Sequence, residues 1–510
     1  MEMTDRTSYL KYGVALLIFI HLLIALPLAY YLNIWTDEAS TLYATQNGFS
    51  VAFQTAVIEQ KQAPLYFWVL SLWRQVSESI FFARLFSILC SVAAIWLFAK
   101  LADRIMRPKA ALLATAFFAL HPFLFWASVE IRVYSLVILL SLGLIYTFLD
   151  AFWDNAENRI APIVRFGILS VIALYTNYYL GPLLVGFLIP LIIYRRWRAV
   201  ANYLATMAAV GLLFLPMILF VRSEMNARSS VFIEDRSVIS GLKILWNHVL
   251  TYLLPTEIFS TGVTSAAAIV RLWLVRVLLV IIAGFVIARR RLVSGHTIML
   301  ATTVATILAF LLVAYFIVGS WLVAIRHASL LFPPLILFFA SLLNDLFGED
   351  EKSRNVFRLA APAFAAIVLA CFTYTLVNLY PHLAKRGDWA RVGQFIEKNE
   401  TPDQPIVVFH TYDALALQYH YRGSNRILPD ERYFEFDFGT PTPEFVAKRT
   451  AYTLSKIPKD SPEIWLLMND ECRTPGICES FEEYIAANYM VVTEQSFFGQ
   501  KAYLLRKRSS

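Results

Sequence analysis

The sequence predicts an α-helical polytopic membrane protein that ends in a small soluble α/β domain. Of its 510 residues, 58% are hydrophobic and only 16% are charged. A soluble protein rarely carries so little charge. The apolar stretches fill the N-terminal part of the chain and thin out after Tyr380. We therefore expect a transmembrane domain over residues 1–380 and a soluble domain over residues 381–510.

Apolar runs long enough to cross a bilayer predict about eleven transmembrane helices, because each helical residue adds about 1.5 Å. The predicted spans cover residues 13–32, 82–101, 110–125, 133–152, 163–178, 180–194, 201–221, 269–288, 297–318, 329–346 and 357–379. The first of them is too long in its apolar core for a cleaved signal peptide, so we expect it to stay in the membrane.

Every second connection between these spans is basic, and basic residues favour the cytoplasmic side of a membrane. The basic groups are Arg6 with Lys11; Arg104, Arg107 and Lys109; Arg159 and Arg165; Arg195, Arg196 and Arg198; Arg289, Arg290 and Arg291; and Lys352, Arg354 and Arg358. An odd number of spans then places the N-terminus in the cytoplasm and the C-terminal domain outside. The net charge of +7 reflects orientation, and we expect no nucleic-acid partner.

Two adjacent acids, Asp37 and Glu38, follow the first span directly. They lie at the predicted outer membrane surface, where a lipid headgroup is within reach. The segment that follows is too long for a turn, and its aromatic and apolar residues predict amphipathic interfacial helices over about residues 38–78. A solvated helix cap is the alternative interpretation of the acid pair.

The predicted interfacial helices cover Asp37 from the side and present Glu59 and Lys61 towards it. Lys61 is either a phosphate contact or an interfacial lysine whose stem lies along apolar surface. Tyr66 lies in the aromatic run of residues 64–73.

Further charged residues are predicted at the outer ends of later spans. Glu130, Arg132 and Tyr134 alternate between the third and fourth spans, and such groups are costly at membrane depth unless they face a cavity or one another. They form either the rim of a cavity or an ion pair that holds two helix ends. Arg326 offers a bidentate fork for a phosphodiester, and Arg84 is either part of the cavity or a helix anchor.

The outer connection over residues 222–264 is long and charged, so we expect a functional or mobile loop. It contains His248, but a lone histidine is seldom a metal ligand, and no metal is assigned.

Two of the four cysteines, Cys472 and Cys478, lie in the predicted outer domain with five residues between them. An outer compartment is oxidising in a diderm bacterium. The spacing is compatible with a disulfide and with two free thiols, because the distance and direction of the two side chains decide whether the bond forms. The other two, Cys90 and Cys371, lie inside predicted spans as core residues.

The soluble tail has the hydrophobic pattern of a small α/β domain. Helices are predicted over residues 388–396 and 414–421, and strands over 405–410, 463–468 and 489–493. The tail has no Gly-rich phosphate loop and no nucleotide fingerprint, so it does not power transport.

Several short segments, in this order, resemble the GT-C superfamily of integral membrane glycosyltransferases. The resembling branch contains protein O-mannosyltransferases, lipid A aminoarabinose transferases and bacterial family 39/83 enzymes. The segments are Thr36-Asp37-Glu38-Ala39-Ser40, Ala63-Pro64-Leu65-Tyr66, Ala83-Arg84-Leu85-Phe86-Ser87, residues 128–134, residues 175–179, and Arg326-His327 followed by Phe332-Pro333-Pro334. Ala63 and Phe86 replace prolines of the family pattern, which affects loop shape more than chemistry.

The resemblance implies a polyprenyl-phosphate-linked sugar as donor. Cations stabilise the leaving phosphate, so one carboxylate that activates the acceptor hydroxyl is sufficient. We assign Asp37 as this general base and Glu38 as the residue that orients the loop or the acceptor. The hypothesised phosphate contacts are Lys61, Arg132 and Arg326, and the cavity rim is formed by Glu59, Glu130, Tyr134, Arg84 and Tyr66. Direct displacement inverts the anomeric centre.

The sequence therefore predicts a glycosyltransferase at the outer face of a bacterial inner membrane, with membrane lipid around it. Its acceptor is lipid A or lipopolysaccharide core, another envelope glycan, a glycolipid or a protein. No cofactor is assigned besides the polyprenyl-phosphate sugar, which is the donor substrate, and no metal is assigned.

Two other classes of protein also have many spans. A secondary transporter or lipid flippase usually has acids near the centres of its spans and shows repeated halves, whereas the charges here concentrate at outer ends. A non-catalytic scaffold would keep its function after Asp37→Asn.

Overall fold

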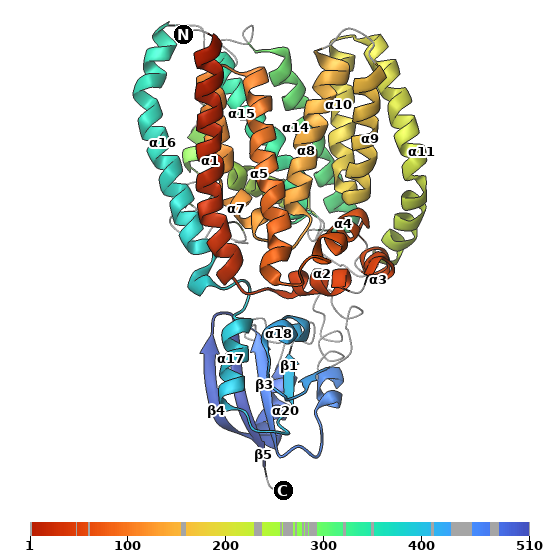
Figure 1. The fold of residues 1–510 in the computed structure, drawn as a ribbon, viewed down its shortest axis with the longest axis vertical. Helices are drawn as coiled ribbons and strands as arrows, with labels where there is room; N and C mark the ends of the chain where they lie inside the picture. The colour runs from red at the N-terminus through yellow and green to blue at the C-terminus, as the bar shows by residue number, and fades with distance from the viewer. Residues whose placement is uncertain are drawn as a thin grey trace. The chain divides into compact units, whose positions relative to one another are not determined.

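The computed structural model describes residues 3–46, 48–59, 62–154, 160–228, 237–255, 258, 269–270, 273–277, 280, 284, 293–319, 323–347, 351–409, 413–429, 451–469 and 479–508. The chain forms two compact units (Figure 1). The membrane unit comprises the described residues within Met1–Tyr30, Gly48–Ser229 and Glu234–Leu379. The C-terminal unit comprises those within Tyr31–Asn47 and Tyr380–Ser510. The predicted boundary between residues 380 and 381 stays a prediction.

The membrane unit is built almost entirely from helices (Figure 1). Its longer helices are α1 (Met3–Tyr31), α5 (Ile80–Ile105), α6 (Pro108–Ala119), α8 (Tyr134–Phe148), α9 (Ile160–Thr176), α10 (Gly181–Ile193), α11 (Trp197–Arg228), α12 (Val238–Leu253), α14 (Gly295–Val318), α15 (Phe332–Phe347) and α16 (Glu351–Leu379). Its shorter segments are α3 (Gly48–Phe53), η1 (Gln54–Glu59), α4 (Leu65–Arg74), α7 (Pro122–Ser128), η2 (Leu149–Trp153), η3 (Tyr178–Leu180) and η6 (His327–Leu331).

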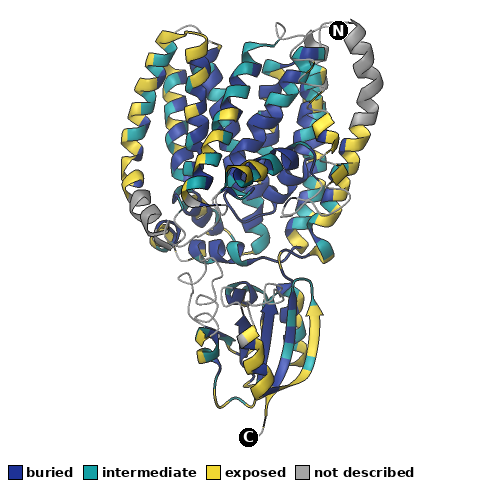
Figure 2. Ribbon diagram, turned by 180° about the vertical axis from the view of Figure 1, so that it is seen from behind, coloured by how far each residue is buried: buried dark blue, intermediate teal, exposed yellow. Residues whose placement is uncertain are grey.

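Helices α8 and α15 lie at the centre of the membrane unit, whereas α1 and α11 lie at its periphery (Figure 2). Helix α5 packs against α6 and α8, and α14 packs against α10 and α15. The peripheral helices expose large apolar side chains, such as Phe19 on α1 and Leu212 on α11. Such surfaces suit lipid and not water. The chain is therefore a multi-span membrane protein, as predicted.

Within the described residues, seven helices are long and apolar enough to cross a bilayer, or up to eight if α6 and the bent helix α7 form one span. The shorter apolar helices Ile160–Thr176 and Tyr178–Ile193 coincide with two further predicted spans. Most of the predicted span over residues 269–288 lies outside the described residues. The total of about eleven spans thus stays a prediction.

The expectation of a long loop over residues 222–264 is wrong for its described part. Helix α11 continues to Arg228, and residues 238–253 form α12. The side chains of Leu245, Leu250 and Tyr252 are buried in the membrane unit. Leu245 and Tyr252 are seven residues apart, a spacing that places both on one face of the helix.

The segment after the first span is helical in its described residues, and its predicted position at the membrane interface stays a prediction. It consists of α2 (Thr36–Gln46), α3, η1 and α4. Helix α4 buries Tyr66, Phe67 and Leu70 on one face, and leaves Leu72 exposed. Helix α2 belongs to the C-terminal unit, whereas α3 and α4 belong to the membrane unit.

The C-terminal unit is a small α/β domain, which confirms the predicted class (Figure 1). Its described strands are β1 (Ile406–Phe409), β2 (Ile427–Leu428), β3 (Glu463–Asn469), β4 (Tyr489–Phe497) and β5 (Gln500–Lys507), in the sheet order β2-β1-β3-β5-β4. Strand β1 runs parallel to β2 and β3, and β5 runs antiparallel to β3 and β4. The helices are α2, α17 (Trp389–Asn399), α18 (Ala414–His420) and α20 (Glu479–Asn488).

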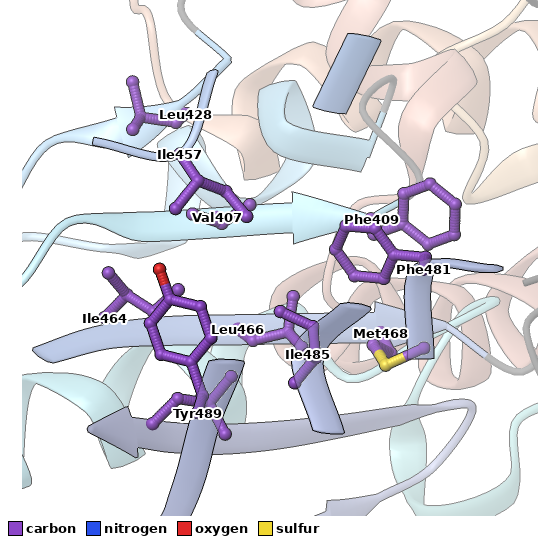
Figure 3. Packing of buried hydrophobic residues seen from close by; sticks show 11 residues of the cluster. Val407, Phe409, Leu428, Ile457, Ile464, Leu466, Met468, Phe481, Ile485 and Tyr489 are labelled. Atoms are coloured by element: carbon purple, nitrogen blue, oxygen red, sulfur yellow. The ribbon is translucent and has the colours of Figure 1, made fainter. Parts of the chain in front are cut away.

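One face of the sheet and helix α20 enclose a hydrophobic core (Figure 3). Val407, Leu466 and Leu505 come from three adjacent strands and are almost completely buried. Phe481 of α20 stacks on Phe409, with 4.3 Å between ring centroids. The C-terminal unit thus has a hydrophobic core of its own.

Candidate active site

The acidic pair lies in the first turn of α2, in the C-terminal unit. Negative side chains are favourable there, because the backbone N–H groups of a first turn are unpaired and the helix dipole is positive. The backbone N–H of Ala39 donates to the carbonyl of Trp35 at 2.9 Å. The hydroxyl of Thr41 donates to the carbonyl of Asp37 at 3.0 Å. The backbone around the acids is thus regular helix.

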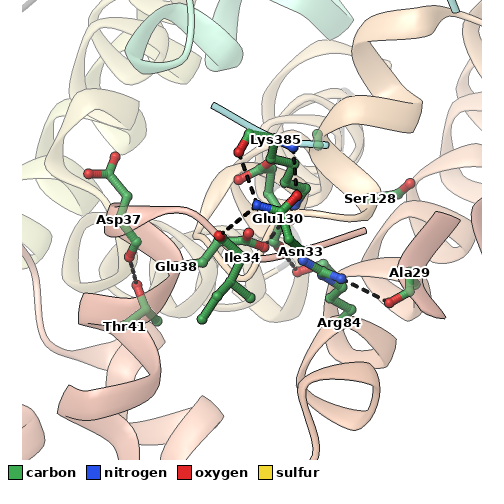
Figure 4. Close-up of polar contacts among 12 residues, drawn as sticks. Ala29, Asn33, Ile34, Asp37, Glu38, Thr41, Arg84, Ser128, Glu130 and Lys385 are labelled. Carbon is green, nitrogen blue, oxygen red and sulfur yellow. Dashed lines mark hydrogen bonds and ion pairs between the residues drawn. The ribbon is translucent and has the colours of Figure 1, made fainter. Parts of the chain in front are cut away.

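Glu38 is completely buried and forms an ion pair with Lys385 (Figure 4). The distance between Nζ of Lys385 and Oε1 of Glu38 is 2.9 Å, and the two side chains are 2% and 0% exposed. Burying two charges costs solvation free energy, and their mutual attraction at close range offsets this cost. The pair therefore fixes the first turn of α2 to the segment that follows α16.

Asn33 binds the backbone of the same segment (Figure 4). Its Nδ2 donates to the carbonyls of Lys385 at 3.2 Å and Gly387 at 2.6 Å. Its Oδ1 accepts from the backbone N–H of Lys385 at 2.7 Å. One buried amide thus binds both backbone N–H and backbone carbonyl groups, as a neighbouring β-strand would.

Helix α18 and its N-cap hold the N-terminal segment at three further points. The hydroxyl of Thr36 donates to the carboxylate of Asp413, which also accepts from the side-chain amide of Asn469 at 3.0 Å. The backbone N–H of Ile34 donates to Nε2 of His420 at 3.1 Å. The hydroxyl of Tyr419 donates to the side chain of Gln46 at 3.1 Å.

Asp37 differs from its neighbour Glu38 in its surroundings. It is only partly buried, and its carboxylate points away from Glu38 and Lys385 (Figure 4). Glu38 is held in a buried ion pair, and the assignment of Asp37 as the base stays a prediction.

The other predicted residues that the structure describes belong to the membrane unit. Arg84 on α5 is completely buried and donates through Nη1 to the carbonyl of Ala29 at 2.9 Å. Ala29 lies near the C-terminal end of α1, where carbonyls lack helical partners. Arg84 therefore binds the end of α1, and its predicted place on the rim of a cavity stays a prediction.

Glu130, Arg132 and Tyr134 lie between α7 and the start of α8, and all three are buried. The hydroxyl of Ser87 on α5 donates to the backbone carbonyl of Glu130 at 2.6 Å. The ring of Tyr134 stacks on Trp126, with 4.8 Å between centroids. Burial of two charged residues in one short connection requires polar surroundings.

Two segments that are far apart in the sequence meet around His327. The ring of Tyr179 in η3 stacks on the ring of His327, with 5.6 Å between centroids. Nε of Arg326 lies 3.5 Å from Nε2 of His327. The structure thus joins the predicted segments 175–179 and 326–327 within the membrane unit. Tyr66 lies on α4, where its ring packs against Phe86 of α5.

Some predicted residues lie outside the description. Lys61, Cys472 and Cys478 are outside the described residues, and the side chain of Glu59 is not described. Their predicted roles stay predictions. Among the described residues, no group of three or more His, Cys, Asp or Glu side chains is placed to hold a metal ion.

Lys385, Asn33 and His420 were not among the predicted site residues. Asn33 follows the first span and Lys385 follows the last one, so both stand at membrane boundaries where a polar residue is ordinary. The only sequence signal was the position of both boundaries on the same predicted side. The pairing itself depends on contacts between residues about 350 positions apart.

The fold places the chain in a known structural class. Residues 61–220 match the family described as dolichyl-phosphate-mannose-protein mannosyltransferase. No curated protein matches the sequence. The predicted resemblance is confirmed: this stretch of the chain matches the family, and the fold is that of the solved structures described next.

Among solved structures, the chain is similar to ArnT from Cupriavidus metallidurans. The structure of ArnT bound to undecaprenyl phosphate matches with a TM-score of 0.59 and 13% identity, over 99% of this chain and 98% of that chain. The apo state matches with a TM-score of 0.58 and 13% identity, over 96% and 97% of the two chains. At this identity, the likeness shows the fold.

Proposed function

We propose that this protein is a glycosyltransferase that transfers a sugar from a polyprenyl-phosphate-linked donor to an acceptor in the bacterial envelope. The proposal is carried by the likeness of fold, over almost the whole chain, to ArnT, whose structure contains undecaprenyl phosphate. The match of residues 61–220 to a family that uses a polyprenyl-phosphate sugar supports it further.

In the proposed reaction, the Asp37 carboxylate accepts the proton of the acceptor hydroxyl. The freed oxygen attacks the anomeric carbon, and the bond from that carbon to the phosphate oxygen breaks. Polyprenyl phosphate leaves with the electron pair, and the anomeric centre is inverted. The partial exposure of Asp37 supports this role, because a base must reach the acceptor.

The remaining residues have assisting roles in this proposal. Lys61, Arg132 and Arg326 contact the phosphate, where positive charge stabilises the leaving group. Glu59, Glu130, Tyr134, Arg84 and Tyr66 form the rim of the cavity. Glu38 orients the loop, a role that its burial and its ion pair support.

The basic connections predict that Asp37 and the C-terminal unit face the outside of the inner membrane. The acceptor is then lipid A or lipopolysaccharide core, another envelope glycan, a glycolipid or a protein.

Mass spectrometry of envelope lipids, glycans and proteins tests the proposal in three strains: wild type, deletion, and deletion complemented with Asp37→Asn. We expect a sugar-sized mass to be lost on deletion and not restored by Asp37→Asn, because an amide cannot accept the proton. Full restoration by Asp37→Asn at wild-type protein level would refute the assigned base. An unchanged envelope after deletion would favour a transporter or a scaffold.

A further inference from the structure

The ion pair between Glu38 and Lys385 stands next to the proposed base, and neither member is accessible to solvent. The two side chains are 0% and 2% exposed, and their charged atoms are 2.9 Å apart. An ion pair on the surface contributes little to a fold. A buried pair is different, because its charges attract each other more strongly than charges on the surface do.

The ion pair restrains the first turn of α2, and this turn contains both Glu38 and Asp37. Adjacent residues of an α-helix point about 100° apart around its axis. When Glu38 is fixed to Lys385, α2 is no longer free to rotate about its axis, and the direction of the Asp37 side chain is fixed as well. The contact of Thr36 with Asp413 restrains the same turn.

The position of Lys385 is itself well defined. Asn33 binds both its N–H and its carbonyl, and the guanidinium of Arg386 lies over the ring of Trp35, 4.2 Å from its centroid. Lysine has a long and flexible side chain, and fixing it costs conformational entropy. The fixed backbone at Lys385 reduces this cost, so the cation is directed at Glu38.

We propose that Lys385 is a positioning residue, which acts through Glu38 to hold the first turn of α2, and with it Asp37, in the orientation that sugar transfer needs. This inference rests on the glycosyltransferase function proposed above. The C-terminal unit thereby supplies a residue on which the base depends, although Lys385 itself touches neither substrate nor reacting atoms.

The test compares Lys385→Met, Glu38→Gln and the double variant Glu38→Gln/Lys385→Met in the deletion strain. The readout is the rate of formation of the sugar-sized envelope mass after induction, divided by the amount of folded protein. We expect Lys385→Met to lower this rate about ten-fold or more, because small displacements of a catalytic group are costly. Glu38→Gln should lower the rate as well, and the double variant should stay within about two-fold of Lys385→Met, because both substitutions remove the same ion pair.

A matched control removes an exposed ion pair of the same unit. Lys501 pairs with Glu494, and their side chains are 30% and 44% exposed. Lys501→Met should leave the rate within about two-fold of wild type.

Each outcome separates this inference from the proposed function. An unchanged rate per folded protein in Lys385→Met, with Asp37→Asn inactive, would overturn the positioning role and leave the function standing. A double variant that regained the wild-type rate would also overturn it, because sugar transfer would then proceed without the ion pair. Activity in Asp37→Asn would refute the base instead. A wild-type strain without the sugar-sized mass would overturn both proposals.

Discussion

At the scale of single residues, the site depends on buried polar side chains that bind the backbone of distant segments. Asn33 is the strongest example, because its amide pairs with one backbone N–H and two carbonyls across the C-terminal unit, besides the carbonyl of Ile34. The side chain is 2% exposed. Water therefore cannot replace the Asn33 amide as the hydrogen-bond partner of these backbone groups.

We expect Asn33→Ala to lower the free energy of unfolding by about 2–4 kcal/mol, because buried donors and acceptors lose their partner. Thermal unfolding of the purified protein in detergent measures this change. Asn399→Ala is the matched control, since its amide donates to the carbonyl of Phe395 at an exposed position. That variant should change the unfolding free energy by about 0.5 kcal/mol or less. Equal effects of the two substitutions would contradict the role of Asn33.

Residue types at the site could be predicted from the sequence, but their partners could not. Acids directly after a span are unusual enough to draw attention to Asp37 and Glu38. Nothing local distinguishes the partly buried acid from the completely buried one, because the two are adjacent and chemically alike. The difference arises from Lys385, which is 347 positions away in the sequence.

At the scale of elements, apolar runs and helix signals predicted most of what the structure shows. Long apolar runs must be helical in a bilayer, and the predicted strands at residues 405–410 and 463–468 are β1 and β3. Strand β5 was missed, because Lys501, Arg506 and Lys507 dilute its apolar pattern. Its place between β3 and β4 depends on long-range pairing, which local periodicity does not contain.

The N-cap of α17 provides a prediction with a defined dependence on pH. Oδ1 of Asp388 accepts from the backbone N–H of Arg391 at 3.4 Å. Burial raises the pKa of the Asp388 carboxyl above its ordinary value, and the charge of Arg391 offsets this only in part. When the pKa of an acid is raised by folding, its ionisation costs stability as the pH rises through that raised value.

We therefore expect Asp388→Asn, which keeps the capping oxygen and cannot ionise, to gain stability relative to wild type between about pH 4 and pH 7. The measurement is the difference in melting temperature between the two proteins across this range. Asp388→Ala serves as the control, because it loses the cap and should be destabilised by about 1 kcal/mol. If the difference in melting temperature stays constant or shrinks as the pH rises, ionisation of Asp388 does not destabilise the fold, and the prediction is wrong.

At the scale of the whole molecule, the sequence order of the chain and its compact units do not coincide. Most of the membrane unit lies between the segment Tyr31–Asn47 and the tail in sequence, yet this segment belongs to the C-terminal unit. Hydropathy predicts a boundary near Tyr380, where the apolar residues end, because it indicates whether each segment lies in lipid or in water. It contains no information on which polar segments pack together.

A truncated protein that ends at Tyr380 tests this assignment. It retains Asp37 and every predicted span, but it loses Lys385, Asp413 and His420 as partners of α2. An isolated helix of 11 residues is marginal in water without tertiary packing. We expect residues 31–47 to be cleaved rapidly by a protease in the truncated protein, and to be protected in the full chain, as measured by mass spectrometry of the fragments in detergent.

Helix α4 is the internal control, because Tyr66, Phe67 and Leu70 are buried within the membrane unit. It should be protected equally in both proteins, which shows that the truncated membrane unit is folded. Under that condition, the truncated protein should also fail to restore the envelope product in the deletion strain, since Asp37 no longer has a fixed direction. Equal protection of residues 31–47 in the two proteins would mean that α2 folds without the tail. The tail would then have a different role, such as binding the acceptor.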